Sequence, residues 1–155
     1  MKNSLYFQYC PKIILLSDDK KQVLLAKRRD EQDYDGTYSF IGGKTETTDE
    51  SLITGLKREK EEEIGTNAKI KICWKISCYQ VLFRKKDGSS MIIPHHPAVF
   101  VSGDVNLNQN EYSNYRWISI DSLRGHEPKV ENIPDAVEHA LRLVEILKNE
   151  DFEEI

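Results

Sequence analysis

The chain has 155 residues, 39% of them apolar and 31% charged, and a formal net charge of −4 at pH 7. This length predicts a single domain over residues 1–155, which can bury about 70% of its unfolded surface. The acidic charge argues against a nucleic-acid coat protein, and no apolar run approaches the roughly 18 residues of a membrane span. Because the N-terminus has no signal-peptide core either, we expect a cytoplasmic protein.

The first predicted elements are two strands joined by a polar turn. Apolar runs at residues 12–17 and 22–27 predict a hairpin of two central strands. A brief strand at 38–41 follows and delivers the chain to Gly42 and Gly43.

A helix is predicted next, from residue 49 to residue 64. Thr47 and Glu50 have the spacing of a capping box, and Gly65 is well placed to end the helix. An apolar stripe marks the face that packs on the sheet, formed by Leu52, Ile53 and Leu56.

The rest of the chain reads as more strands and a closing helix. Residues 68–84 are rich in strand-forming side chains, Asp87 and Gly88 form a turn, and further strands are expected at 98–102 and 116–120. A second helix is expected to begin near Pro134, and its apolar stripe comprises Val137, Ala140, Leu141, Val144 and Leu147. This order predicts an α/β fold in which a mixed β-sheet lies between the two helices.

The first helix ends in an unusual run of glutamates. Anions near a helix C-terminus oppose the helix dipole and cost up to about 1 kcal/mol each, so stability alone does not favour this pattern. Glu59, Glu62 and Glu63 converge on one face, where a hard cation such as Mg²⁺ would find oxygen ligands. The alternative is a solvated charged face, in which the glutamates pair with Lys57, Arg58 and Lys60.

The order of these residues resembles the Nudix box. That pattern is Gly, five residues, Glu, seven residues, Arg-Glu, an apolar residue, any residue, Glu-Glu, any residue, Gly and an apolar residue. The matching positions are Gly43, Glu50, Arg58, Glu59, Glu62, Glu63 and Gly65. The chain departs from the pattern in having six residues between Gly43 and Glu50, Lys60 and Thr66 at apolar places, and Ile41 where a proline often stands. We expect the Lys60 stem to lie along the sheet and its ammonium to point outward.

The resemblance implies a Nudix α/β/α sandwich and a hydrolase of MutT type. Members use Mg²⁺, with Mn²⁺ as an alternative, to split a phosphoanhydride bond in a nucleoside diphosphate derivative. By similarity, the metal ligands and catalytic carboxylates would be Glu59, Glu62 and Glu63, together with the Gly42 carbonyl. Arg58 and Glu50 would form the pair that fixes these carboxylates. Glu111, six residues before Trp117, has the spacing of a further catalytic and metal-binding glutamate, or it is an exposed loop residue.

Four residues outside the glutamates are expected to bind substrate. Arg28 has the spacing of a MutT-type arginine that contacts phosphate, although Arg28 and its neighbour Arg29 could also be surface charges. Lys44 is a second candidate for phosphate, and Phe40 for the nucleobase. Asn132 matches a base-reading asparagine, or it is a helix N-cap.

The favoured substrate is a nucleoside triphosphate, with oxidised bases included, cleaved to monophosphate and pyrophosphate. The alternatives are ADP-ribose, a dinucleoside polyphosphate or capped RNA, and a Nudix domain that senses a nucleotide without cleaving it. ADP-ribose is disfavoured because Val81 and Leu82 stand where a proline is frequent. Adjacent His95 and His96 point to opposite faces of a strand, so we expect no shared ion. The oligomeric state is left open, with a homodimer among the alternatives.

Overall fold

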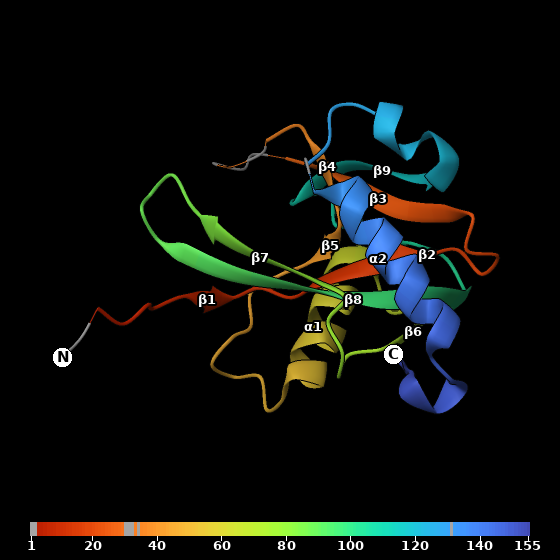
Figure 1. Ribbon diagram of the computed structural model, residues 1–155, viewed down its shortest axis with the longest axis horizontal. Helices are drawn as coiled ribbons and strands as arrows, with labels where there is room; N and C mark the ends of the chain where they lie inside the picture. Colours follow the sequence, from red (N-terminus) through yellow and green to blue (C-terminus); the bar gives the residue numbers. More distant parts are fainter. Residues whose placement is uncertain (1–2, 30–32, 34, 131) are drawn as a thin grey trace.

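A mixed β-sheet runs through the middle of the molecule, as seen in a computed structural model that describes residues 3–29, 33, 35–130 and 132–155 (Figure 1). The helices are α1 (Leu52–Ile64) and α2 (Ile133–Ile146), with short 3-10 helices η1 (Ile120–Gly125) and η2 (Asn149–Asp151). The strands are β1 (Gln8–Tyr9), β2 (Lys12–Leu16), β3 (Gln22–Arg28), β4 (Tyr38–Ser39), β5 (Ile41–Gly42), β6 (Lys69–Ile72), β7 (Tyr79–Arg84), β8 (Ser90–Ser102), β9 (Tyr112–Ser119) and β10 (Glu153–Glu154).

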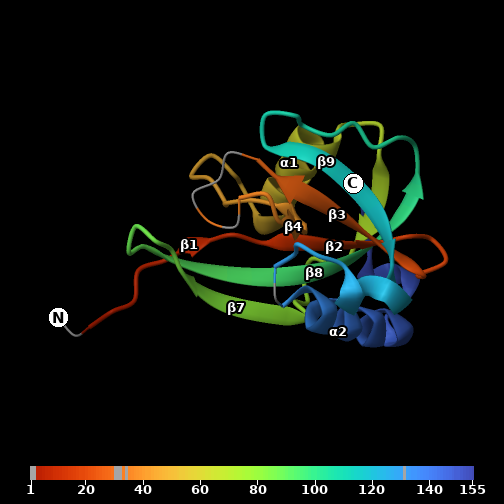
Figure 2. The ribbon, with the colours of Figure 1, turned by 90° about the horizontal axis from the view of Figure 1, so that it is seen from above.

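The two helices cover opposite faces of this sheet (Figure 2). Alternate residues of β2 separate the two layers of the core: Ile14 and Leu16 pack in the cluster that contains α2, and Ile13 and Leu15 in the cluster that contains α1. Since side chains alternate along a strand, β2 is buried on both faces. The predicted hairpin of central strands and the predicted α/β/α sandwich are both confirmed.

The strands β2 and β3 pair with each other only at one end, and at the other end each pairs with a short strand next to the glycine pair. The main path runs β10-β6-β8-β2-β3-β4, with β2 and β8 parallel. β2 and β3 pair at Leu16 and Val23, near the turn that joins them. Farther along, β4 pairs with β3 and β5 pairs with β2, where Lys12 lies opposite Gly42. The short β5 therefore places Gly42 beside the first residue of β2.

The strand β8 is longer than the sequence predicted. We expected one strand after the Asp87–Gly88 turn and another at residues 98–102. Instead, Ser90–Ser102 is one strand of 13 residues. Its first half pairs with β7 and β1 and its second half with β6 and β2. The first half, together with β7 and β1, extends beyond the two helices as an arm (Figures 1 and 2).

The helix α1 begins three residues later than predicted. Its N-cap is Ser51, whose hydroxyl accepts a hydrogen bond from the Thr54 N–H at 3.3 Å, so the Thr47–Glu50 capping box was wrong. Asp49 closes a turn before the cap, since its carboxylate accepts from the Glu46 N–H at 2.8 Å. Gly65 ends the helix with a φ of 89°, as predicted.

Lys60 corrects a second expectation for this helix. Its side chain is buried, and its ammonium donates to the carbonyl oxygens of Gly65 at 3.4 Å and Ala68 at 2.9 Å. Burial lowers the pKa of this ammonium. The ammonium does not point outward, because the loop after α1 folds back and supplies acceptors at the helix end.

The helix α2 follows its apolar pattern closely. Ile133 starts it, Pro134 lies in its first turn, and Leu147 lies just beyond its last residue. Ile133, Ala136, Val137, Ala140 and Val144 are buried against the sheet. No helix in the described part of the chain is both long enough and apolar enough to cross a membrane.

Candidate active site

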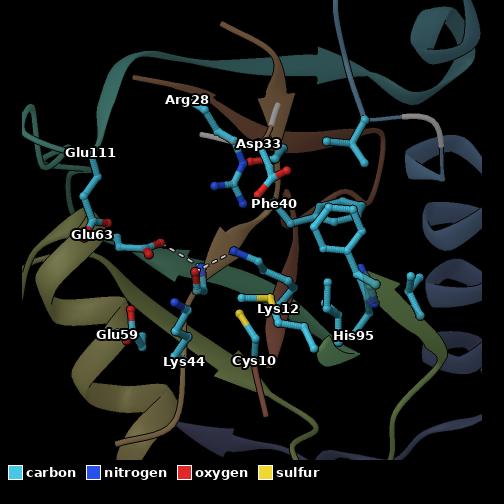
Figure 3. A pocket seen from close by; sticks show the side chains of 18 of the residues that line it. Cys10, Lys12, Arg28, Asp33, Phe40, Lys44, Glu59, Glu63, His95 and Glu111 are labelled. Atoms are coloured by element: carbon cyan, nitrogen blue, oxygen red, sulfur yellow. Dashed lines mark hydrogen bonds between the residues drawn. The ribbon is translucent and has the colours of Figure 1, made fainter. Parts of the chain in front are cut away.

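A cavity of about 410 Å³ opens beside Gly42 and runs toward the β7–β8 arm (Figure 3). Nine of the ten residues predicted to act on metal or substrate line it, namely Arg28, Phe40, Gly42, Lys44, Glu59, Glu62, Glu63, Glu111 and Asn132. Arg58, the tenth, is not in the lining but contacts three glutamates that are, Glu46, Glu59 and Glu62. The structure therefore brings together residues that the sequence separates widely.

The glycine pair allows α1 and β2 to approach the same point. Gly42 has a φ of 125°, and a Cβ atom there would lie 2.8 Å from the Lys12 Cα. A Cβ atom on Gly43 would overlap the Glu59 carboxylate. Both positions therefore need glycine for steric reasons.

Glu63 is the most buried carboxylate of the cavity wall, with 2% of its surface exposed. Its Oε2 accepts from the Gly42 N–H at 2.7 Å and from the Tyr112 hydroxyl at 3.1 Å. Burial raises the pKa of Glu63 to about 8, against the opposing effects of the Lys12 charge and the Gly42 N–H. A carboxylate in this position is costly to ionise unless a cation comes close.

Arg58 holds the other carboxylates through a partner that the sequence analysis did not assign. Its Nε and Nη2 donate to the two oxygens of Asp49, at 2.9 and 3.0 Å, and its Nη1 donates to Glu59 at 2.9 Å and Glu62 at 3.2 Å. The hydrogen bonds from Arg58 lower the pKa of Asp49 to about 2. Glu50, the expected partner, is exposed. The Arg58–Glu50 pair was therefore wrong.

The local sequence explains why Asp49, and not Glu50, pairs with Arg58. Asp49 is separated from Gly43 by five residues, the spacing that Glu50 lacks, and it lies in the turn before α1. Gly55 faces it from the helix, where a Cβ atom would lie 2.8 Å from Asp49 Oδ2. A glycine inside a helix costs about 1 kcal/mol relative to alanine. Here it leaves room for the carboxylate that anchors Arg58.

The cavity glutamates suit a hard cation that arrives with its own ligands. In the described part of the chain, no three acidic, histidine or cysteine side chains enclose a site on their own. Mg²⁺ is usually bound by one or two carboxylates, water and substrate phosphate oxygens rather than by a closed protein cage. Burial is the main cause that raises the pKa of Glu59 and of Glu63. The negative charge of Glu111 raises both further. The carboxylate oxygens of this wall fit such an ion.

Four cationic side chains line the same cavity. Arg28 and Lys44 do so as predicted, and Lys12 and Lys85 were not predicted. Arg29 is exposed and donates to the Gln109 carbonyl at 2.9 Å, so it supports the loop before β9. The structure thus separates the two arginines that sequence alone left equivalent.

The other end of the cavity is mainly apolar. Phe40 and His95 pack edge to face, with ring centroids 5.5 Å apart, and side chains from the β7–β8 arm complete the wall. His95 Nδ1 lies 3.2 Å from the Tyr79 carbonyl oxygen, and burial lowers the pKa of this histidine to about 4. His96 instead contacts the Ile76 carbonyl. His95 is therefore a neutral wall residue of the cavity.

Asn132 stands at the N-cap position of α2, yet among the described residues its side chain has no capping hydrogen bond. Its backbone is helical, with φ −79° and ψ −2°, rather than extended as at a typical N-cap. Asn132 is among the residues that line the cavity. The capping alternative is thereby contradicted.

Several site residues escaped sequence reasoning. Gly55, an unfavourable residue inside a helix one turn before Arg58, was the available signal for Asp49. Lys12, at the head of an otherwise apolar strand, was a signal of the same kind. Asp33 carries a buried oxygen with no hydrogen-bond partner in the described residues and lies near Arg28 (Figure 3), but nothing in its local sequence marked it.

Solved structures share this architecture at low sequence identity. A MutT protein from Methanosarcina mazei Go1 is 23% identical, with a TM-score of 0.70 over 92% of this chain and 99% of that one. A Nudix hydrolase from Clostridium perfringens is 20% identical, with a TM-score of 0.70 over 90% and 99%. The Nudix domain of Shewanella oneidensis NrtR, solved with ADP-ribose, is 19% identical, with a TM-score of 0.69 over 93% and 90%. At these identities the likeness is one of fold.

The sequence itself provides the family assignment. A comparison with curated proteins finds no match. The family model of the NUDIX domain matches residues 12–140, which include both central strands, the glutamate helix and most of α2. The chain therefore belongs to the NUDIX domain family.

Proposed function

We propose that this Nudix pyrophosphohydrolase cleaves a nucleoside triphosphate to the monophosphate and pyrophosphate. The cavity offers the groups that such a substrate needs, because its lining includes carboxylates, cations, apolar side chains and Asn132. Its volume of about 410 Å³ lies within the range of small-molecule sites. Members of the family generally use divalent metals, and the proposed cofactor here is Mg²⁺, with Mn²⁺ as a substitute.

The proposed metal ligands are Glu59, Glu62, Glu63, Glu111 and the Gly42 carbonyl. A bound divalent ion would polarise a phosphoryl oxygen and acidify a water molecule. Arg58, anchored on Asp49, orients Glu59 and Glu62. Arg28 and Lys44 offset the negative charge of the phosphates, and one of the glutamates accepts the proton of the attacking water.

The main support for a nucleotide substrate is Asn132, whose side chain makes no capping hydrogen bond within the described residues. An amide can donate and accept at once, which is the pattern needed to read the edge of a base. A capping role would have used its oxygen on the helix backbone, and that bond is lacking in the described residues. Phe40 and the apolar side chains of the arm would then contact the faces of the base.

The substrate ranking of Asn132→Asp tests this proposal. Wild type and variant are assayed with Mg²⁺ against nucleoside triphosphates, including oxidised purines, and against ADP-ribose, dinucleoside polyphosphates and capped RNA. We expect the variant to fold normally, because aspartate suits a helix start as well as asparagine does. Its preference among the bases should change by about a hundredfold, since a mismatched buried polar group is costly.

The matched control is Asn149→Asp, an exposed asparagine remote from the cavity lining. This variant should keep the wild-type ranking. Identical rankings for wild type and Asn132→Asp would contradict base reading by Asn132. A wild-type enzyme that cleaves ADP-ribose, dinucleoside polyphosphates or capped RNA faster than any triphosphate would contradict the proposed substrate.

A further inference from the structure

A lysine begins the central strand of the sheet. Lys12 is 8% exposed and precedes four fully buried apolar residues of β2. It pairs with Gly42 of β5 on one side and with His95 of β8 on the other. Burying an ammonium group is unfavourable unless its hydrogen-bonding capacity and its charge are used.

The contacts of Lys12 use part of that capacity. Its Nζ donates to the Gly42 carbonyl at 2.7 Å, the one hydrogen bond that the described residues offer it. An ammonium has three donors, so two are left for the cavity that Lys12 lines. Figure 3 shows the Lys12 side chain between the glutamates and the Phe40–His95 pair. It therefore lies where the two ends of the cavity meet.

The position of Lys12 differs from that of the other three cations of the lining. Lys44 is exposed, and Arg28 and Lys85 are half-buried, whereas Lys12 is almost fully enclosed. A charge-assisted hydrogen bond from an enclosed donor is worth more than one from an exposed donor, because water competes less for the acceptor.

We propose that Lys12 is a substrate-binding residue whose two remaining N–H donors hold an oxygen of the phosphate nearest the nucleoside. The proposal rests on the proposed function in taking the substrate to be a nucleotide. This phosphate joins the base-bearing part of the substrate to the part that faces the glutamates, so it must pass the junction at which Lys12 lies. The alternative role for Lys12 is that of a counter-charge for Glu63, with no contact to substrate.

Binding of nucleosides and their monophosphates separates these two roles. Affinities for adenosine, guanosine, cytidine and uridine, and for the four 5′-monophosphates, are measured calorimetrically with EDTA present, so that metal binding does not contribute. Wild type should bind at least one monophosphate about tenfold or more tightly than its nucleoside. Lys12→Met should bring that ratio close to one, and Lys12→Arg should retain most of it.

Lys57→Met is the matched control, because Lys57 is exposed on α1 and its loss changes the net charge equally. Thermal unfolding shows that each variant is folded, and Lys12→Gln, which also removes the charge, carries the test if Lys12→Met is not. A wild-type protein without preference for the phosphate, or a charge-removing variant with an unchanged ratio, overturns the proposal. A normal ratio combined with altered Mn²⁺ binding in that variant would assign the counter-charge role instead. If wild type cleaves no triphosphate but Lys12→Met loses phosphate affinity, the proposed function fails and the role of Lys12 stands.

Discussion

The two ends of the cavity are built in different ways. The carboxylate end comes largely from one stretch, Gly42 to Glu63, and is tied together by hydrogen bonds and ion pairs around Arg58 and Glu63. The apolar end is assembled from Phe40, the β7–β8 arm and the start of α2, which are far apart in the chain and meet mainly through packing. The groups proposed to act on the phosphates are thus largely neighbours in the sequence, whereas the surface expected to choose the substrate depends on the tertiary fold.

The largest expected effect lies at the carboxylate end. Glu63→Gln should keep the fold, because an amide oxygen can still accept from Gly42 and Tyr112. Loss of the charge should lower kcat/KM about a thousandfold with Mg²⁺, since several kcal/mol of stabilisation disappear. Steady-state kinetics measure this. Glu61→Gln, which alters the same helix outside the cavity, should stay within about twofold of wild type, and near-normal turnover by Glu63→Gln would refute the site.

A smaller effect is expected from Asp49, which acts on the cavity glutamates only through Arg58. Asp49→Ala removes the anchor of Arg58, so Glu59 and Glu62 lose their orientation. Activity should fall by about 10- to 100-fold, the usual cost of losing a residue that supports metal ligands. Glu50→Ala should change little, because Glu50 is exposed. If kinetics showed Glu50→Ala to be the more damaging variant, the assignment of Asp49 would be incorrect.

At the apolar end, the expected effect is a pH-dependent change in the free energy of unfolding that comes from His95. His95 has a pKa of about 4 when folded against about 6.5 when unfolded, so the unfolded chain binds more protons between these values. The contribution of His95 to stability therefore falls as the pH drops from about 6.5 toward 4, and linkage gives a loss of about 2 kcal/mol from this residue between pH 8 and pH 5. The raised pKa of Glu63 acts in the opposite direction over this range, so the quantity to measure is the difference between variant and wild type at each pH. Urea unfolding should show this difference changing by about 2 kcal/mol for His95→Gln and staying constant for His139→Gln, an exposed control.

Local sequence patterns predicted the carboxylate end well where one periodic helix decided the geometry. The spacing of Glu59, Glu62 and Glu63 placed them on one wall, as a 3.6-residue period requires. The Asp49 anchor was missed because a single extra residue in the preceding turn changes which carboxylate reaches Arg58. The direction of Lys60 was missed because its acceptors come from the loop that folds back after Gly65. The geometry of the turn before α1 and of the loop after it does not follow from helical periodicity.

The apolar end was far less accessible from sequence. Phe40 and Asn132 were identified through their spacing to the glycines and to Trp117, but His95 and the arm residues reach the cavity through the register of β8 with β2 and β7. That register depends on contacts between distant segments. The strands β1 and β10 have two residues each, too few to show a period.

Arg58 also bears on how tightly any metal can bind. Its guanidinium touches Glu59 and Glu62 and is itself fixed by Asp49, so a cation tethered to the protein already occupies part of the space between the carboxylates. An incoming ion must exchange with it rather than fill an empty negative site, which weakens the affinity for the free ion. Ions that arrive already bound to a polyphosphate gain extra contacts and are favoured in this exchange. We therefore expect free Mg²⁺ to bind the resting protein more weakly than Mg²⁺ carried by a polyphosphate substrate.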